Sequence, residues 1–204
     1  MKALIVVDCQ QDFMPGGALA VPHGDEVVPV INKLLPKFDL VIFTKDWHTE
    51  DNIGFASQHD LNPFDKLFNG DTVWPDHCIQ NTPGADLHPG IDLALCKKDF
   101  YIFKKGDKPE AHPYSGFGEF KESDPEGLFN ELGIFLDEKD VDEIFVCGLA
   151  GDFCVKETVL DAANTYLYET NVIIDACRSI GDIEPVLTEF SANSRITIIN
   201  SEQI

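Results

Sequence analysis

The sequence predicts an α/β fold: a doubly wound, mostly parallel six-stranded sheet with helices on both faces. Short apolar runs alternate with helical patterns along the chain, which is typical of repeated β-α-β units. Runs such as Leu-Ile-Val-Val and Val-Ile-Ile are apolar on both faces, as in parallel strands covered on both sides. With 204 residues, the chain is long enough for one well-buried domain and short for two, so we expect one domain over residues 1–204.

Each expected element follows from local periodicity. Strands are expected over residues 3–7, 40–44, 101–104, 143–147, 171–174 and 196–199. Helices are expected over residues 26–35, 127–136, 152–166 and 184–193. The stretch 48–113 breaks the alternation and is rich in Pro, Gly, Asn, Asp and His, which favours a long functional loop.

Charge and composition exclude several classes of protein. The formal net charge is −21, with 36 acidic against 15 basic residues, which argues against binding nucleic acid or anionic membranes. No apolar run reaches the length of a membrane span, and the N-terminus does not resemble a signal peptide. The six scattered cysteines have no zinc-finger or CxxC spacing, so we expect reduced thiols in a cytoplasmic protein. The sequence does not determine the oligomeric state, and a homo-oligomer is compatible with it.

Cys154 lies in the most informative segment, residues 146–158. The segment reads as a buried strand, a turn of small residues, and a helix that begins beside the cysteine, with Asp152 as the expected N-cap. Unpaired N–H groups and the helix dipole would favour a thiolate there, and hence an activated nucleophile. A buried structural cysteine explains the local pattern equally well.

Other reactive side chains follow neighbouring strands. Asp8, Asp46 and Lys105 come at expected strand ends, and the carboxyl ends of parallel strands meet at one edge, where ligands bind. Asp8 could take the proton of Cys154 and pass it to a leaving amine, while Lys105 could stabilise the thiolate. Their ordinary alternatives are a strand-end cap for Asp8 and a solvated lysine for Lys105. Backbone N–H groups of the turn before Cys154 could form an oxyanion hole.

A second pattern indicates a metal ion. Asp46 and His48 lie two residues apart on one side of an extended segment, and His77 follows in Trp-Pro-Asp-His-Cys. Mixed carboxylate and imidazole ligands suit zinc, iron or manganese. Taken singly, each histidine is as well explained as a polar residue of the surface or core.

Several motifs together resemble those of a known family. They are Val-Val-Asp-Cys-Gln-Gln-Asp-Phe-Met-Pro-Gly-Gly-Ala-Leu from residue 6, Thr-Lys-Asp-Trp-His from 44, Phe-Ala-Ser-Gln-His from 55, Trp-Pro-Asp-His-Cys from 74, Asn-Thr-Pro-Gly-Ala-Asp-Leu-His from 81, Tyr-Ser-Gly-Phe from 114 and Gly-Leu-Ala-Gly-Asp-Phe-Cys-Val from 148. The set is similar to the nicotinamidases (pyrazinamidases) of the isochorismatase-like cysteine hydrolases. It appears in family order from residue 1 to about residue 178.

The resemblance implies a fold, a reaction and roles for residues. The fold would be isochorismatase-like, which is Rossmann-like. The reaction is hydrolysis of nicotinamide to nicotinate and ammonia through a cysteine thioester, in NAD salvage, with pyrazinamide as a further substrate. Cys154 matches the nucleophile, Asp8 the general acid and base, and Lys105 the third member of the triad. The N–H groups of Ala150 and Cys154 match the oxyanion hole, with a cis peptide before Ala150.

The resemblance also implies the substrate wall and the metal ligands. Phe13, Leu19, Trp74 and Tyr114 match the residues around the pyridine ring. The metal ligands, which hold the ring nitrogen directly or through water, match Asp46, His48 and His77. One divalent ion is expected, zinc ahead of iron or manganese.

This chain departs from the family pattern at one metal position. Many members carry a further histidine ligand where this chain has Asn52, and the usual proline is Thr49. An amide oxygen is a weaker ligand than imidazole for such ions. The ion would then have three protein ligands, or a fourth from Asp51, Asn52 or a nearby carboxylate.

Two other functions stay open. Another cysteine amidase of the superfamily would act on a carbamoyl or different amide substrate, although the metal motif favours a pyridine. Isochorismate hydrolysis is disfavoured because all three triad positions are filled. A catalytically silent binding protein on this fold is the alternative from a different class, and release of ammonia from nicotinamide separates it from the enzymes.

Overall fold

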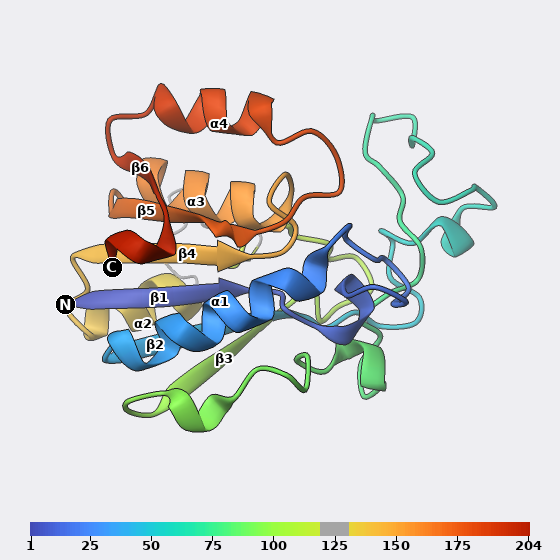
Figure 1. The fold of residues 1–204 in the computed structure, drawn as a ribbon. Coiled ribbons are helices and arrows are strands. Elements are labelled where there is room, and N and C mark those ends of the chain that lie inside the picture. The colour runs from blue at the N-terminus through green and yellow to red at the C-terminus, as the bar shows by residue number, and fades with distance from the viewer. Residues whose placement is uncertain (119–130) are drawn as a thin grey trace.

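The computed structural model describes residues 1–118 and 131–204. A six-stranded, entirely parallel sheet forms the centre, in the order β3-β2-β1-β4-β5-β6 (Figure 1). The strands are β1 (Lys2–Val7), β2 (Leu40–Asp46), β3 (Phe100–Lys105), β4 (Glu143–Gly148), β5 (Glu169–Cys177) and β6 (Ile196–Ile199). The chain runs outward in one direction from β1 to β3 and in the other from β4 to β6. The predicted doubly wound sheet is therefore confirmed.

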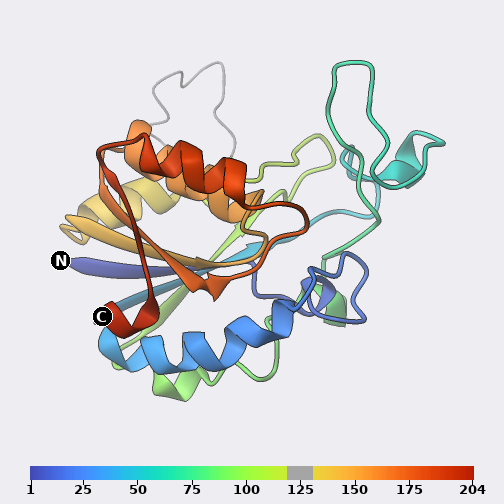
Figure 2. The ribbon, with the colours of Figure 1, turned by 45° about the horizontal axis from the view of Figure 1, so that its top comes forward.

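Within the part of the chain that the structure describes, four α-helices cover the two faces of the sheet. They are α1 (Val27–Leu34), α2 (Glu131–Glu138), α3 (Cys154–Asn164) and α4 (Glu184–Ser191). Figure 2 shows α1 on one face and α2, α3 and α4 on the other. Because helices cover both faces, a central strand has no side that faces water. Every residue of β2 is accordingly buried, as is every residue of β1 after Lys2.

The expected elements differ from the observed ones mainly at their ends. The helix expected over 127–136 is found from Glu131 to Glu138, and residues 127–130 lie outside the described residues. The expected N-cap role of Asp152 was wrong, because α3 has Phe153 as its N-cap. The Asp152 carboxylate instead accepts hydrogen bonds from the N–H groups of Ile180 and Gly181, which lie after β5. Cys154 is nevertheless in the first helical turn, as predicted.

Most of the long connection between β2 and β3 lies beyond the carboxyl ends of the strands (Figure 2). Its last part returns to the other end of the sheet, where Lys97 pairs with Asp39. It contains short 3₁₀ turns but neither an α-helix nor a strand of the sheet. Isolated bridges hold it together, pairing His48 with Ile79 and Phe55 with Trp74. These bridges bring histidines that are far apart in the sequence to the edge where the strands end.

Two further observations concern the chain as a whole. Within the described residues, no helix combines the length and the hydrophobicity needed to cross a bilayer. All six cysteines are free thiols, and five of them are buried.

Candidate active site

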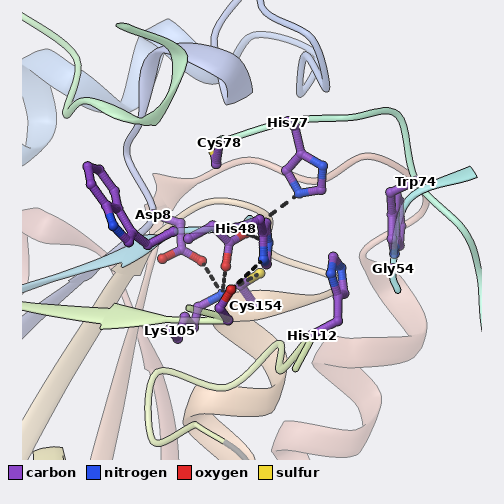
Figure 3. Close-up of polar contacts among 12 residues, drawn as sticks. Asp8, His48, Gly54, Trp74, His77, Cys78, Lys105, His112 and Cys154 are labelled. Atoms are coloured by element: carbon purple, nitrogen blue, oxygen red, sulfur yellow. Dashed lines mark hydrogen bonds and ion pairs between the residues drawn. The ribbon is translucent and has the colours of Figure 1, made fainter. Parts of the chain in front are cut away.

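Asp8, Lys105 and Cys154 meet where the strand order reverses. Asp8 follows β1, Lys105 ends β3, and Cys154 opens α3 just after β4. The Lys105 ammonium lies 2.9 Å from Oδ2 of Asp8 and 3.6 Å from Sγ of Cys154 (Figure 3). It also pairs with Oδ1 of Asp46. All four side chains are buried, so the convergence expected from the strand ends is found.

The Asp8 carboxylate is held in one orientation by its neighbour on β2. The Asp8 backbone N–H donates to the Thr44 carbonyl oxygen at 3.2 Å, and the Thr44 hydroxyl donates to Oδ1 of Asp8 at 2.7 Å. Oδ2 of Asp8 accepts no directed hydrogen bond within the described residues, although Lys105 lies beside it as an ion pair. One carboxylate oxygen each from Asp8 and Asp46 lies within 4.8 Å of Sγ of Cys154. Oδ2 of Asp8 is therefore the natural proton acceptor for the thiol.

Burial and neighbouring charges shift the pKa values of all three groups in opposing directions. Burial raises the pKa of the Cys154 thiol well above its ordinary value; Lys105 acts to lower it, and Asp8 to raise it. Burial also raises the pKa of Asp8, against the lowering effect of Lys105. Burial alone would lower the pKa of Lys105, but the carboxylates of Asp46 and Asp8 raise it well above the usual value. Burial therefore opposes the thiolate that the helix end would favour at Cys154, and the Lys105 ammonium acts against burial.

The turn before α3 provides two amide groups near the sulfur. The Leu149–Ala150 peptide is cis, as the resemblance implied. Within the described residues, neither the Ala150 nor the Cys154 N–H donates a hydrogen bond. Gly148 has φ of +121°, and a Cβ atom there would lie 2.1 Å from the Val7 carbonyl oxygen, so a side chain cannot be accommodated. The close approach of β4 to β1 therefore sets the position of the turn.

An aromatic pocket opens above Cys154. Its empty volume is about 320 Å³, counting space open to solvent. The lining residues are Phe13, Leu19, Asp46, Trp74, His77, His112, Pro113, Tyr114, Ala150, Phe153, Cys154 and Ile180. All four wall residues expected from the sequence are among them.

Trp74 is held on two sides. Its indole N–H donates to the Tyr114 hydroxyl at 3.0 Å, and its ring lies edge-on to Phe153 with centroids 4.8 Å apart. The sequence did not indicate a role for Phe153, which directly precedes Cys154 in the motif from residue 148. The result is a narrow apolar wall suited to a flat aromatic ring.

Asp46, His48 and His77 form a second cluster beside this wall. Oδ2 of Asp46 lies 3.6 Å from Nε2 of His48 and 3.7 Å from Nε2 of His77. Nε2 of His48 is fully buried and has no hydrogen-bond partner within the described residues. A tetrahedral ion about 2.1 Å from each ligand would space these atoms about 3.4 Å apart. The residues therefore fit a divalent ion.

The hydrogen bonds fix the tautomers of these two histidines. Nδ1 of His48 lies 3.1 Å from the Gly106 carbonyl oxygen, and Nδ1 of His77 lies 2.7 Å from the Pro75 carbonyl oxygen. A carbonyl oxygen only accepts, so each Nδ1 carries the proton and each Nε2 keeps its lone pair. Metal-binding histidines are usually held in this way.

Two neighbouring residues differ from expectation. Asn52 is buried, but its amide is bonded to backbone groups and to His112. His112, which sequence reasoning missed, stacks on His48 with ring centroids 4.5 Å apart. Burial, together with His48 and His77, holds the pKa of His112 well below its usual range. Its only sequence signal was a position two residues before Tyr114, without a recognisable spacing.

Comparisons with known proteins agree with this geometry. The model of the isochorismatase domain matches residues 2–185. The nicotinamidase of Escherichia coli is 42% identical over 191 residues, covering 90% of this chain and 85% of that protein. The structure of an Acinetobacter baumanii nicotinamidase and pyrazinamidase superposes with a TM-score of 0.88 at 35% identity, over 99% of this chain and 97% of that one. The Pyrococcus horikoshii pyrazinamidase in complex with zinc gives a TM-score of 0.78 at 35% identity, over 98% of each chain.

Proposed function

Because this chain belongs to the isochorismatase family, we propose that it hydrolyses nicotinamide to nicotinate and ammonia, with pyrazinamide as a further substrate. The observation that carries the proposal is the buried cluster of Asp8, Lys105 and Cys154 beneath an aromatic pocket. A flat pyridine ring held between the apolar walls of that pocket would direct its carboxamide toward the sulfur.

In the first half of the reaction, Sγ of Cys154 attacks the carboxamide carbon while its proton passes to Asp8. The negative charge that develops on the amide oxygen is received by the N–H groups of Ala150 and Cys154. Lys105 stabilises the sulfur as it loses its proton, because its ammonium lies 3.6 Å away. Asp8 then gives the proton to the amine nitrogen, the C–N bond breaks, and ammonia leaves a thioester on Cys154.

In the second half, a water molecule takes the place of ammonia. Asp8 is now a carboxylate again. It accepts a proton from this water while the water oxygen attacks the thioester carbon. The C–S bond breaks, Asp8 passes the proton to the sulfur, and the acid product loses its own proton to solvent as nicotinate. The same oxygen of Asp8 serves in both halves, which explains why Thr44 holds the other oxygen.

We also assign Asp46, His48 and His77 as ligands of one divalent ion. Zinc is the ion we propose, because these donors suit it and a similar pyrazinamidase structure contains it. When bound, the ion supplies a grip on the ring nitrogen, directly or through water. The apolar wall then orients the carboxamide toward Cys154, which is a positioning role.

The cellular role that fits this reaction is NAD salvage in the cytoplasm. The free thiol of every cysteine supports a reducing compartment.

Purified protein supplied with nicotinamide tests the proposal. We expect release of ammonia and nicotinate in equal amounts, measured by a coupled ammonia assay and by chromatography. Pyrazinamide should also be hydrolysed. Turnover of an N-carbamoyl amide with no turnover of nicotinamide would favour another cysteine amidase of the superfamily. Binding of nicotinamide without any hydrolysis would favour a silent binding protein.

A further inference from the structure

His112 enters the metal-binding cluster from a different segment than the other ligands. Its ring stacks on His48 with an interplanar angle of 13°, and it lies edge-on to His77 with centroids 5.9 Å apart. The potential ligand nitrogens of these three histidines all lie within 4.8 Å of one another (Figure 3). The three imidazoles and the Asp46 carboxylate line one small volume. Because an ion binds in the plane of an imidazole, the His112 ring would tilt out of its stack on His48 to reach a shared ion.

The amide of Asn52 has one possible orientation. Its Nδ2 donates to the carbonyl oxygens of Lys108 and Ala111 at 3.0 and 2.7 Å. Its Oδ1 accepts from the Gly54 N–H at 2.9 Å. Turning the amide over would set donors against donors and acceptors against acceptors, so these three bonds identify the oxygen and the nitrogen.

This orientation determines the tautomer of His112. Nδ1 of His112 lies 2.9 Å from Oδ1 of Asn52, which can only accept, so Nδ1 carries the proton. His112 is then the third histidine in the cluster whose Nδ1–H is held by an oxygen, after His48 and His77. All three keep the lone pair on Nε2, the arrangement that metal-binding histidines share.

The backbone leaves room for these rings at two glycines. A Cβ atom on Gly54 would lie 2.1 Å from Nδ1 of His112. A Cβ atom on Gly106 would lie 2.4 Å from Cε1 of His48. Distances under 3.0 Å force a shift, so an alanine at either position would displace an imidazole. The close packing shows that the rings are placed by their surroundings.

We propose that His112 is the fourth protein ligand of the divalent ion and that Asn52 is a positioning residue that holds the His112 ring. The inference rests on the metal ion of the proposed function. The amide at position 52 is therefore not a weak substitute for the histidine expected there. The third imidazole is supplied 60 residues later in the chain, and Asn52 orients it.

Metal affinity tests this proposal without reference to activity. The full chain is stripped with chelator, and zinc affinity is measured by competition with a fluorescent chelator. We expect His112→Gln and His112→Ala to weaken zinc binding by at least about 100-fold, and Asn52→Ala by about 10- to 100-fold. His59→Gln is the matched control, because His59 lies in the same loop but is only half-buried, and its Nε2 bonds to the Ile53 carbonyl oxygen. Its affinity should equal that of the wild type.

A double-mutant cycle separates a positioning role from general damage to the loop. If Asn52 acts through His112, Asn52→Ala should cost little further affinity once His112 is alanine. Full additivity would overturn the positioning role. Circular dichroism checks that each variant is folded. X-ray absorption of zinc-loaded wild type, which needs no variant, should count three imidazole ligands, and a count of two would overturn the proposal.

The outcomes also distinguish this inference from the proposed function. Wild-type affinity in the His112 variants would overturn the fourth ligand and leave the three-ligand site standing. A wild-type protein that binds no zinc, iron or manganese would overturn both metal assignments. Ammonia release would still test the cysteine chemistry independently.

Discussion

The ammonium nitrogen of Lys105 lies 3.6 Å from the sulfur of Cys154, and both side chains are buried. Burial raises the pKa of the Cys154 thiol, and the Lys105 ammonium acts to lower it. The same ammonium pairs with the carboxylates of Asp8 and Asp46. Proton transfer from Cys154 to Asp8 therefore moves a negative charge from one neighbour of Lys105 to another, which keeps the cost of ionisation low.

Replacing the nucleophile should abolish turnover. We expect Cys154→Ala to release no measurable ammonia, because alanine removes the attacking atom without adding bulk. Cys147→Ala is the control, since Cys147 is also buried but lies within β4 and does not line the pocket. It should remain active. Near-wild-type ammonia release from Cys154→Ala would make this cysteine structural.

Loss of either partner of the cysteine should be severe. Asp8→Asn and Lys105→Ala should each lower kcat by about 10²- to 10⁴-fold, because each removes a group that handles charge or a proton. The double variant should lose far less than the product of the two, because the residues act as a unit. Lys104→Ala is the control, since Lys104 lies over the Trp47 ring, away from Cys154. Steady-state ammonia assays give all four values, and fully multiplicative losses would contradict a shared role.

The pH profile should report the raised pKa of Asp8. Asp8 must be ionised to accept the proton, so activity is lost as pH falls through its pKa. Because burial raises that pKa, the acid limb of kcat/KM should lie above 3.8, the ordinary value for aspartate. Asp161, whose pKa is raised to about 6 by burial, lies outside the pocket, so Asp161→Asn should leave the limb unchanged. An acid limb at or below 3.8 would contradict the assignment.

Removing the metal should affect substrates unequally. The ion positions the ring nitrogen, so stripped enzyme should show a rise in KM for nicotinamide at least as large as its fall in kcat. Benzamide, which lacks the ring nitrogen, should be hydrolysed at nearly the same rate with and without the ion. Elemental analysis that finds no metal in active, unchelated enzyme would refute this role and leave the cysteine mechanism intact.

A single methyl group should loosen the metal site. Gly54→Ala places a Cβ atom 2.1 Å from Nδ1 of His112, so the ring must move. Zinc affinity should fall by about 10-fold or more, as for other losses of support around a ligand. Gly70→Ala is the comparison in the same loop, because no atom lies within 4 Å of its added Cβ. Its φ of +93° strains an alanine, so a fall in zinc affinity in this variant would report backbone strain and not a displaced ring. Equal zinc affinity in the two variants would show that His112 does not depend on this space.

The sheet could be predicted because its strands have a sequence pattern that is visible within each strand alone. A strand buried on both faces must be apolar at every position, and residues such as Leu4 and Ile42 carry that pattern without reference to the rest of the chain. The strand ends then placed Asp8 and Lys105 at one edge by topology alone. The sequence alone therefore predicts that these two residues lie at the same edge of the sheet.

Other features depend on neighbours that are distant in the sequence. Asp152 reads as a helix cap, but the loop at Ile180 offers its carboxylate two N–H groups. The protonation of Cys154 depends on how deeply it is buried, which local sequence does not record. His112 lies 60 residues after Asn52, and its Nδ1 lies 2.9 Å from the Asn52 side-chain oxygen. These are outcomes of three-dimensional packing.

Asp46 turns one carboxylate oxygen toward Lys105 and the other toward His48 and His77. The ammonium also lies 2.9 Å from Oδ2 of Asp8, so Lys105 keeps a carboxylate partner whether or not a cation occupies the second oxygen of Asp46. One residue therefore borders both clusters, and its two oxygens have different tasks. Ring binding and attack by the sulfur can then change separately, because a substitution in the histidine cluster leaves the pair of Lys105 and Cys154 in place.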